Sequence, residues 1–541
     1  MKLFEIVADG LAQFGVTHLY GLIGDANLFM VNSFVAKGTG RYVACNHEAS
    51  AVLAAIGHAQ VTGRTGVATI THGPALTNAA TALTEAAKGG IPLVLICGDT
   101  APDDLRHLQK TDQRALVLAT GADFVDLRRP DTALEDMERA FRRARHHRMP
   151  VVLNMRIDLQ WQEAEPQTIG FGIPELALAP ATGNLLDEAV GMLASAKRPL
   201  ILAGRACIGD TARDALIALA DRIEAPLATT LKAQGLFHGH PFNIGISGNL
   251  SHPTATEVIM QSDCILAFGA SLSRYTTENG AYTKDKRVIQ VLPDALETPR
   301  MEPPTIRLVG DIAGTARAMT ELLDMAEIAG SAATDAALAD RLKAETAAFE
   351  TLPPEEATAP GTVDIVPALR RLHQELPRRR ILVADLGRFV FSAWRNLPVT
   401  HPRDLVYTAH FGGIGCGMGG AIGAATTVPD VPTVLVAGDG GMMLSALGEL
   451  SVLKREGADV IILVCNDGSY GAEHVQFTSR KLSPALSMTV PPDFAAMARA
   501  AGLEAVTVTD PESLGAACTA IKNRRGPILI DLHLDPEKVF K

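Results

Sequence analysis

The sequence predicts an α/β protein built from three doubly wound parallel-sheet domains. Short runs rich in β-branched residues alternate along the chain with amphipathic helical stretches, which is the pattern of parallel α/β sheets. The runs in the last third are almost continuously apolar, as expected of strands that are buried on both faces. At 541 residues, the chain is too long for a single core and suits three domains of roughly 150–180 residues.

The first block covers residues 1–170, with helices expected at 50–63 and 78–88 between its strands. A segment rich in Pro, Gly and Glu, residues 161–183, is interpreted as a linker to the next block. The strand-like runs are residues 17–24, 42–48, 66–73, 92–99, 122–127 and 149–155.

The second block covers residues 184–328, and the third covers residues 360–541. Between them lies an Ala-rich helical stretch followed by a Pro-rich segment at 351–362. The strand-like runs of the second block are residues 198–204, 225–230, 264–271, 287–293 and 306–311. Those of the third block are residues 380–387, 404–410, 433–440, 459–467, 504–509 and 527–534.

Composition and charge exclude several classes of protein. A net charge of −11 argues against a broad nucleic-acid or anionic-membrane surface, since both need basic patches. The seven cysteines are scattered, without a C-x-x-C pair, which predicts buried free thiols in a reducing compartment. The N-terminus lacks the apolar core of a signal peptide and no stretch is long and apolar enough to span a bilayer, so we expect a cytoplasmic protein.

Two Gly-rich turns in the third block carry the first chemical signal. GDGG at 438–441 follows one apolar run, and NDG at 466–468 follows the next. Ligands of open parallel sheets lie beyond the carboxyl ends of the strands, and Gly-rich turns let backbone N–H groups approach an anion. Oxygen side chains at this edge suit Mg²⁺, which would retain diphosphate oxygens and water as its other ligands. The alternative is a pair of ordinary βα turns that use Gly and Asp for their turn geometry.

Other motifs make the first reading more specific. Residues 46–99 begin with HE-x-x-A and continue through TG, GP and TN, residues 411–424 read FGGIGCGMGGAIGA, and residues 21–28 read GLIGDANL. With GDGG, these motifs resemble, in order, those of the thiamine-diphosphate enzymes of the acetolactate synthase, pyruvate decarboxylase and benzaldehyde lyase superfamily. The resemblance covers essentially the whole chain. It implies a pyrimidine-binding domain, a central domain and a diphosphate-binding domain.

The resemblance also implies how the cofactor is held. Glu48 matches the carboxyl group that keeps N1′ of the aminopyrimidine protonated, although a helix-start Glu beside the dipole would look the same in isolation. Ile414 matches the apolar wedge that bends the cofactor, and Gly412 matches the carbonyl that accepts from N4′. The remaining cofactor-binding positions implied are Gly438, Asp439, Gly440, Gly441, Asp467, Ser469, Tyr470 and Gly471.

The metal ligands depend on the alignment. The usual spacing of 27 from Asp439 leads to Asn466. The helix after GDGG, however, has one residue more than usual, and NDGSYG matches the paired NN-x-x-YG of the family, whose second member binds the metal. We therefore favour Asp467 over Asn466, with the carbonyl of Ser469 completing the set of Asp439 and Asp467.

Four residues are candidates for the substrate side. Asp25 and Glu473 match catalytic acids of simple 2-oxo acid decarboxylases, and His72 replaces a small residue before the GP pair. Gln109 resembles a Gln that lines the channel of carboligases. Proton donors and acceptors at these places suit acid–base chemistry, whereas the structural alternatives are a turn Asp, a solvated helix Glu and a capped loop His. The adjacent His pair of pyruvate decarboxylases is missing, and only His107 stands in that region.

The resemblance implies Mg²⁺-dependent decarboxylation of a small 2-oxo acid, followed by carboligation of the resulting enamine to an acceptor carbonyl, as in acetolactate synthase. Release of an aldehyde by a non-oxidative decarboxylase is the alternative, and an FAD-containing oxidase is the second one. The segment at 269–280, with Arg274, departs from the flavin-binding pattern and favours a central domain without FAD. Because the active site in this family lies between two subunits, we expect at least a homodimer and, as is usual, a homotetramer.

Overall fold

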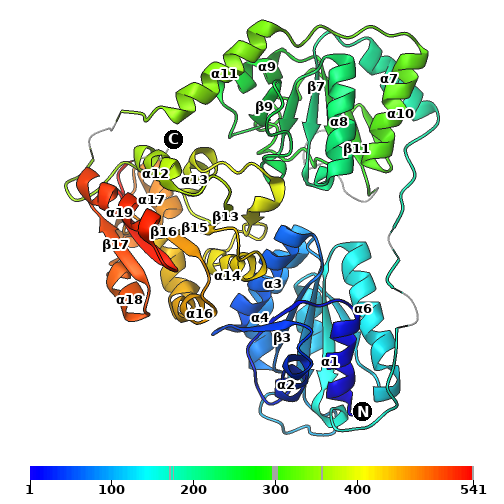
Figure 1. Ribbon diagram of the computed structural model, residues 1–541, viewed down its shortest axis with the longest axis vertical. Coiled ribbons are helices and arrows are strands. Elements are labelled where there is room, and N and C mark those ends of the chain that lie inside the picture. Colours follow the sequence, from blue (N-terminus) through cyan, green and yellow to red (C-terminus); the bar gives the residue numbers. More distant parts are fainter. Residues whose placement is uncertain (170–171, 175, 295–302, 355–357, 539–541) are drawn as a thin grey trace. The chain divides into compact units, whose positions relative to one another are not determined.

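The computed structural model describes residues 1–541 except 170–171, 175, 295–302, 355–357 and 539–541. The described residues contain three six-stranded parallel sheets with helices packed on them (Figure 1), which confirms the predicted fold class. The chain divides into two compact units. Unit 1 comprises residues 1–175, 354–396 and 406–541, and unit 2 comprises residues 176–353 and 397–405.

The first sheet of unit 1 has the strand order β2-β1-β3-β4-β6-β5, and all its neighbouring strands run parallel. Its strands are β1 (His18–Gly21), β2 (Arg41–Ala44), β3 (Gly66–Ile70), β4 (Leu93–Asp99), β5 (Asp123–Asp126) and β6 (Pro150–Arg156). Its helices are α1 (Leu3–Gln13), α2 (Leu28–Ala36), α3 (Glu48–Thr62), α4 (Pro74–Gly89), α5 (Gln113–Ala119) and α6 (Ala133–His147).

The second sheet of unit 1 repeats the same strand order, β14-β13-β15-β16-β18-β17. Its strands are β13 (Ile381–Ala384), β14 (Leu405–Tyr407), β15 (Thr433–Gly438), β16 (Val460–Asn466), β17 (Glu504–Val508) and β18 (Ile528–His533). Its helices are α12 (Ile365–Glu375), α13 (Val390–Asn396), α14 (Gly417–Thr427), α15 (Asp439–Gly441), α16 (Leu450–Glu456), α17 (Gly471–Ser479), α18 (Phe494–Ala500) and α19 (Pro511–Asn523). The repeated order places corresponding strand ends at the ligand-binding edge of each sheet.

Unit 2 contains the remaining sheet, with the order β12-β11-β10-β7-β8-β9. Its strands are β7 (Pro199–Ala203), β8 (Leu227–Thr229), β9 (Asn243–Ile246), β10 (Cys264–Phe268), β11 (Arg287–Leu292) and β12 (Ile306–Val309). Its helices are α7 (Asn184–Ala194), α8 (Asp210–Ile223), α9 (Pro253–Gln261), α10 (Ile312–Met325) and α11 (Ala336–Glu350). Strand β9 was not predicted, because its sequence NIGI carries Asn and Gly where a strand signal needs β-branched residues.

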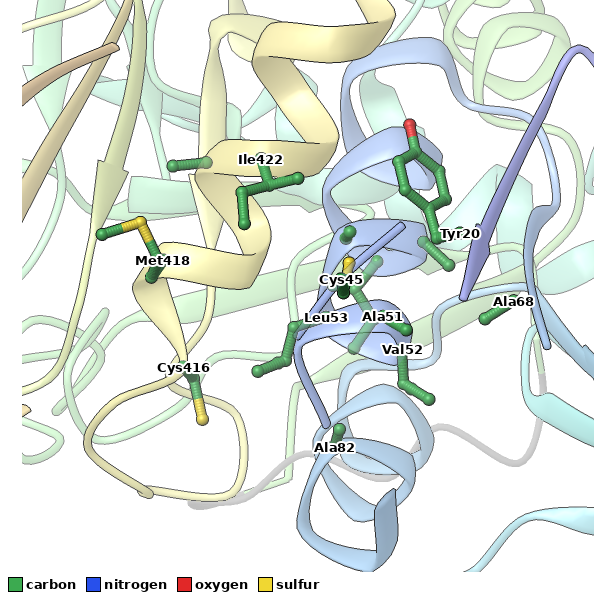
Figure 2. Close-up of a cluster of buried hydrophobic side chains, with 14 of the residues drawn as sticks. Tyr20, Cys45, Ala51, Val52, Leu53, Ala68, Ala82, Cys416, Met418 and Ile422 are labelled. Carbon is green, nitrogen blue, oxygen red and sulfur yellow. The ribbon is translucent and has the colours of Figure 1, made fainter. Parts of the chain in front are cut away.

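One hydrophobic core joins the two sheets of unit 1 through α3 and α14 (Figure 2). Helix α3 is apolar on nearly all faces, which is typical of a helix buried on every side. The backbones approach so closely that a Cβ on Gly57 would lie 2.3 Å from the Gly420 carbonyl oxygen. A Cβ on Gly423 would lie 2.0 Å from the Ala54 carbonyl oxygen, so glycine is required at this crossing.

The structure also bears on the other expectations from the sequence. All seven cysteines are buried and none forms a disulfide, as predicted. Within the described part of the chain, no helix is both long and apolar enough to cross a membrane. The domain boundaries at 170, 184, 328 and 360 stay predictions.

Candidate functional site

Three neighbouring strands of the second sheet of unit 1 end in acidic residues. Strands β13, β15 and β16 lie side by side and parallel, and they are followed by Asp385, Asp439 and Asp467 respectively. All three residues are buried. Because parallel strands end at one edge, residues far apart in the sequence meet there.

The Asp439 carboxylate is buried and one of its oxygens lacks a hydrogen-bond partner among the described residues, as expected of a cation ligand. Burial, together with the nearby charge of Asp467, raises the pKa of Asp439 to about 7. Its Oδ2 atom is buried and has no hydrogen-bond partner among the described residues. In the described part of the chain, no group of three His, Cys, Asp or Glu side chains forms a metal centre alone, so a cation here would also need backbone or ligand oxygens. This donor set fits Mg²⁺ with a diphosphate.

The two candidates for the second metal ligand have different surroundings. Asn466 is the last residue of β16. Its side-chain amide donates to Asp531 Oδ1 at 3.0 Å. Asp467 begins the turn, and its charge acts on Asp439. Its Oδ1 accepts from the backbone N–H and the hydroxyl of Ser469, at 2.9 and 2.7 Å.

The helix after GDGG, in which we expect one residue more than usual, contains a π-helical segment, Met442–Ala446. A π-bulge accommodates one inserted residue without breaking the helix, and such bulges are frequent at functional sites. Within it, the Ser445 hydroxyl donates to the Gly415 carbonyl oxygen at 2.5 Å. The π-helical segment thus contacts the Gly-rich stretch at residues 411–424, which we call the cofactor loop. The choice of Asp467 over Asn466 stays a prediction.

Asp385 holds the predicted cofactor loop. Its carboxylate accepts from the backbone N–H groups of Gly415 at 2.8 Å and Cys416 at 3.3 Å. Burial raises the pKa of Asp385 to about 6, although these N–H groups oppose the shift. Gly412 has a left-handed φ of 88°, and Ile414 Cδ1 lies 3.8 Å from the place of a Cβ on Gly440. The predicted wedge therefore lies against the GDGG turn.

Glu48 starts α3 and accepts a hydrogen bond from Asn78 Nδ2 at 3.0 Å. Asn78 lies on α4, one turn before Thr81. The Thr81 methyl group is 3.6 Å from the place of a Cβ on Gly413. Glu48 and the cofactor loop thus contact the same face of α4 within one chain.

Two buried carboxylates, Glu85 and Glu449, each accept hydrogen bonds from the backbone of a segment that belongs to the other sheet. Glu85 on α4 accepts from the backbone N–H groups of His410 at 2.8 Å and Phe411 at 2.6 Å, just before the cofactor loop. Glu449, after the π-bulge, accepts from the backbone N–H of Asn46 at 3.1 and 3.2 Å, two residues before Glu48. Each half of the site is therefore held by a carboxylate from the other half.

Asp25, His72 and His107 form a second cluster, at the carboxyl edge of the first sheet. His72 Nδ1 lies 3.5 Å from Asp25 Oδ1, and the His72 and His107 rings are 5.2 Å apart. Burial lowers the pKa of His72, and the Asp25 carboxylate opposes that shift. His72 Nε2 is buried without a hydrogen-bond partner among the described residues. The His72 and His107 rings are thus neighbours although the residues are 35 positions apart in the sequence.

The other predicted residues are placed as follows. The Gln109 carbonyl oxygen lies 2.4 Å from the place of a Cβ on Gly73, so its loop packs against the residue after His72. Glu473 is exposed in the first turn of α17 and forms no side-chain hydrogen bond or ion pair with another described residue. The Tyr470 ring lies 3.1 Å from the place of a Cβ on Gly440, next to the GDGG turn.

Several residues that build the site are not among those predicted from the sequence. Asp385 lies near the end of the predicted run 380–387, as Asp439 does in the run 433–440, so the rule that identified Asp439 could have found it. Glu85, Glu449 and Arg388 carry no local signal, because each acts on backbone or side chains far away in the sequence.

Parallel sheets with acidic residues at their carboxyl edges and a Gly-rich loop beside them are typical of α/β proteins that bind a ligand at that edge. Three family models match the chain. They are the N-terminal TPP binding domain of thiamine pyrophosphate enzymes at residues 1–116, the central domain at 186–319 and the C-terminal TPP binding domain at 385–532. The chain belongs to the thiamine pyrophosphate enzyme family and is an enzyme that uses this cofactor.

Curated relatives align over nearly the whole chain. An acetolactate synthase large subunit from Parasynechococcus marenigrum is 27% identical, over 97% of this chain and 86% of its own. A protein named "Probable 2-ketoarginine decarboxylase AruI" from Pseudomonas aeruginosa is 27% identical, over 97% and 92%. A sulfoacetaldehyde acetyltransferase from Castellaniella defragrans is 27% identical, over 95% and 89%. These names include a synthase, a decarboxylase and an acetyltransferase.

Proposed function

We propose that the protein is a thiamine-diphosphate- and Mg²⁺-dependent enzyme that decarboxylates a small 2-oxo acid and joins the remaining fragment to an acceptor carbonyl compound. The names of the relatives, acetolactate synthase and sulfoacetaldehyde acetyltransferase among them, support this class. The observation that carries the proposal is the orphaned, buried Oδ2 of Asp439 beside Asp467, at the edge where a Gly-rich turn can receive a diphosphate.

The chain's own residues have distinct roles in this proposal. Asp439 and Asp467, with the Ser469 carbonyl, hold the metal, and the N–H groups of the GDGG turn bind the diphosphate. Glu48 holds a proton at N1′ of the aminopyrimidine, while Ile414 and the Gly412 carbonyl keep the cofactor bent. The bound cofactor supplies a carbon nucleophile that adds to the 2-carbonyl and accepts the electrons left by CO₂.

Non-oxidative decarboxylation is the second candidate, and the Asp25–His72 contact favours it. Release of an aldehyde requires a proton to reach the substrate carbon, and this pair, with His107 beside it, offers groups able to deliver one. Glu473 and Gln109 are further candidates for the substrate side. An FAD-containing oxidase is the third candidate. Arg274, the residue nearest to the flavin pattern, is exposed and donates to the Tyr275 hydroxyl at 2.7 Å.

The deciding experiment is a panel of 2-oxo acids, including pyruvate and benzoylformate, assayed for CO₂ with and without an acceptor aldehyde. Joined products with little free aldehyde support carboligation, and free aldehyde as the main product supports decarboxylation. Purified protein without flavin absorbance counts against the oxidase. No rise in melting temperature with thiamine diphosphate and Mg²⁺ would contradict the whole proposal.

The assembly and location are part of the proposal. We infer a cytoplasmic homodimer at minimum, and a homotetramer as its usual form, because the resembled family builds its site between subunits. Helices α3 and α14 pack together within one chain, so their contact does not itself require a second subunit. Small 2-oxo acids are the expected partners, and the net charge of −11 speaks against nucleic acid and anionic membranes. Light scattering of the purified enzyme measures the number of subunits.

A further inference from the structure

Arg388 lies directly against the proposed metal ligand Asp467. It follows β13 by four residues, and its Nε and Nη2 atoms are 2.8 and 2.7 Å from Asp467 Oδ2. The two side chains are only 9% and 7% exposed. A guanidinium that contacts a carboxylate through two nitrogens at these distances makes a strong, directional ion pair.

The other oxygen of Asp467 is also engaged. Oδ1 accepts from the Ser469 backbone N–H and from its hydroxyl. Oδ2 accepts one hydrogen bond, from Arg388 Nε, and lies 2.7 Å from the positively charged Nη2. Mg²⁺ needs a carboxylate oxygen directed at it, and in this arrangement the Arg388 guanidinium lies against Oδ2 while Ser469 engages Oδ1.

Arg388 is held in place from two further sides. Its Nη1 donates to the Pro536 carbonyl oxygen at 3.0 Å. Its Cδ atom would lie 2.5 Å from a Cβ on Gly471, so the side chain passes directly under the turn that follows Asp467. The positive charge is therefore buried beside the place proposed for the metal and the diphosphate.

We propose that Arg388 is an internal cation that keeps Asp467 from free Mg²⁺ until a diphosphate draws the guanidinium away, so that metal and diphosphate load as one unit. The inference rests on the proposed function, because it takes Asp467 as the metal ligand and thiamine diphosphate as the anion. Guanidinium groups bind phosphate oxygens as well as carboxylates, so Arg388 keeps an ionic partner when it leaves Asp467. The coupling is reciprocal, since each ligand must raise the affinity for the other by the same factor.

The test is calorimetric titration of metal-depleted full-length protein with MgCl₂, in the absence and presence of saturating thiamine diphosphate. In the wild type we expect thiamine diphosphate to tighten Mg²⁺ binding on the order of 100-fold. In Arg388→Gln, Mg²⁺ alone should bind on the order of 10-fold more tightly than in the wild type, and the coupling should fall below about 10-fold. The exposed Arg480→Gln on the nearby α17 terminus is the matched control and should behave as the wild type.

A second variant covers the case in which Arg388→Gln does not fold. Arg388→Lys keeps the charge but replaces the two-nitrogen contact by a point charge, so its coupling should lie between those of wild type and Gln. If both Arg388 variants have the same Mg²⁺ affinity and the same coupling as the wild type, the role given to Arg388 is wrong, whereas the proposed function still stands. Failure of the wild type to bind thiamine diphosphate at any Mg²⁺ concentration would overturn the proposed function and this inference with it.

Discussion

The carboxylate of Glu85 accepts both the backbone N–H of His410, at 2.8 Å, and its ring Nδ1, at 2.6 Å, across 325 positions of sequence. Burial alone would raise the pKa of Glu85, yet the hydrogen bonds from His410 and Phe411 hold it below its ordinary value. The carboxylate is therefore ionised and holds the segment that leads into the cofactor loop. The loop is positioned by a helix of the other sheet.

Replacing Glu85 by Gln should lower the free energy of unfolding by about 2 kcal/mol, since hydrogen bonds to charged groups contribute about 1.5–3 kcal/mol. Affinity for thiamine diphosphate should fall as well, because the cofactor loop loses its anchor. Urea unfolding without cofactor and calorimetric titration with cofactor measure the two effects. The exposed Glu512→Gln is the control. Stability and affinity equal to the wild type in Glu85→Gln would show that the contact does not position the loop.

Glu48→Gln should abolish exchange of the C2 proton of bound thiamine diphosphate while the cofactor stays bound. An amide cannot keep a proton at N1′ as a carboxyl group does, whereas the diphosphate contacts are unchanged. Proton exchange followed by NMR after deuterium pulses measures the rate, and calorimetry checks binding. A rate in the variant equal to that of the wild type refutes the role given to Glu48.

Asp467→Ala should weaken metal-dependent binding of the cofactor more than Asn466→Ala does. Asp467 begins the turn beside Asp439, whereas the Asn466 amide donates to Asp531 within the sheet. Titration of each variant with Mg²⁺ at fixed thiamine diphosphate gives the two affinities. The opposite ranking would move the metal ligand to Asn466 and make the π-bulge irrelevant to the alignment.

Asp25→Asn and His72→Phe should each lower kcat on the order of 100-fold, with the affinity for thiamine diphosphate unchanged. Because the two side chains act as one proton-transfer unit, the double variant should be little slower than either single variant. Steady-state kinetics on the best 2-oxo acid measures this, with the exposed Asp430→Asn as control. Losses that multiply in the double variant would mean that the residues act separately.

His58 should make the fold sensitive to mild acid. Burial lowers the pKa of His58 from 6.5 to about 4, and its Nδ1 lies 2.9 Å from Thr427 Oγ1 on α14. Below pH 6.5 His58 therefore binds a proton in the unfolded chain, whereas in the folded chain it stays neutral down to about pH 4. The free energy of unfolding accordingly falls as the pH drops from 6.5 to about 4.

Between pH 7 and pH 5 the loss from His58 should be about 2 kcal/mol, and His58→Asn should be free of it. Urea unfolding of both proteins at the two pH values isolates this contribution. Burial also lowers the pKa of His373 to about 4. His373 therefore makes the wild type and His58→Asn equally sensitive to acid, and its contribution cancels in the comparison. An equal drop in wild type and variant would contradict the assignment.

The sequence by itself determined the α/β class, every described strand except β9, and the two acidic turns. These features are local: continuous apolar runs mark strands that are buried on both faces, and Gly beside Asp marks the turns that end them. The extra helical residue is a prediction from a spacing, and the structure has a π-helix, Met442–Ala446, in that stretch.

Only the tertiary structure decided which distant groups meet. The pairs Glu85–His410, Glu449–Asn46, Arg388–Asp467 and His72–His107 are 325, 403, 79 and 35 positions apart. Their contacts follow from the order of strands in each sheet and from the crossing of α3 with α14, which depend on packing of the whole unit. No local pattern carries that information, because a buried carboxylate and a solvated one read alike until their neighbours are in place.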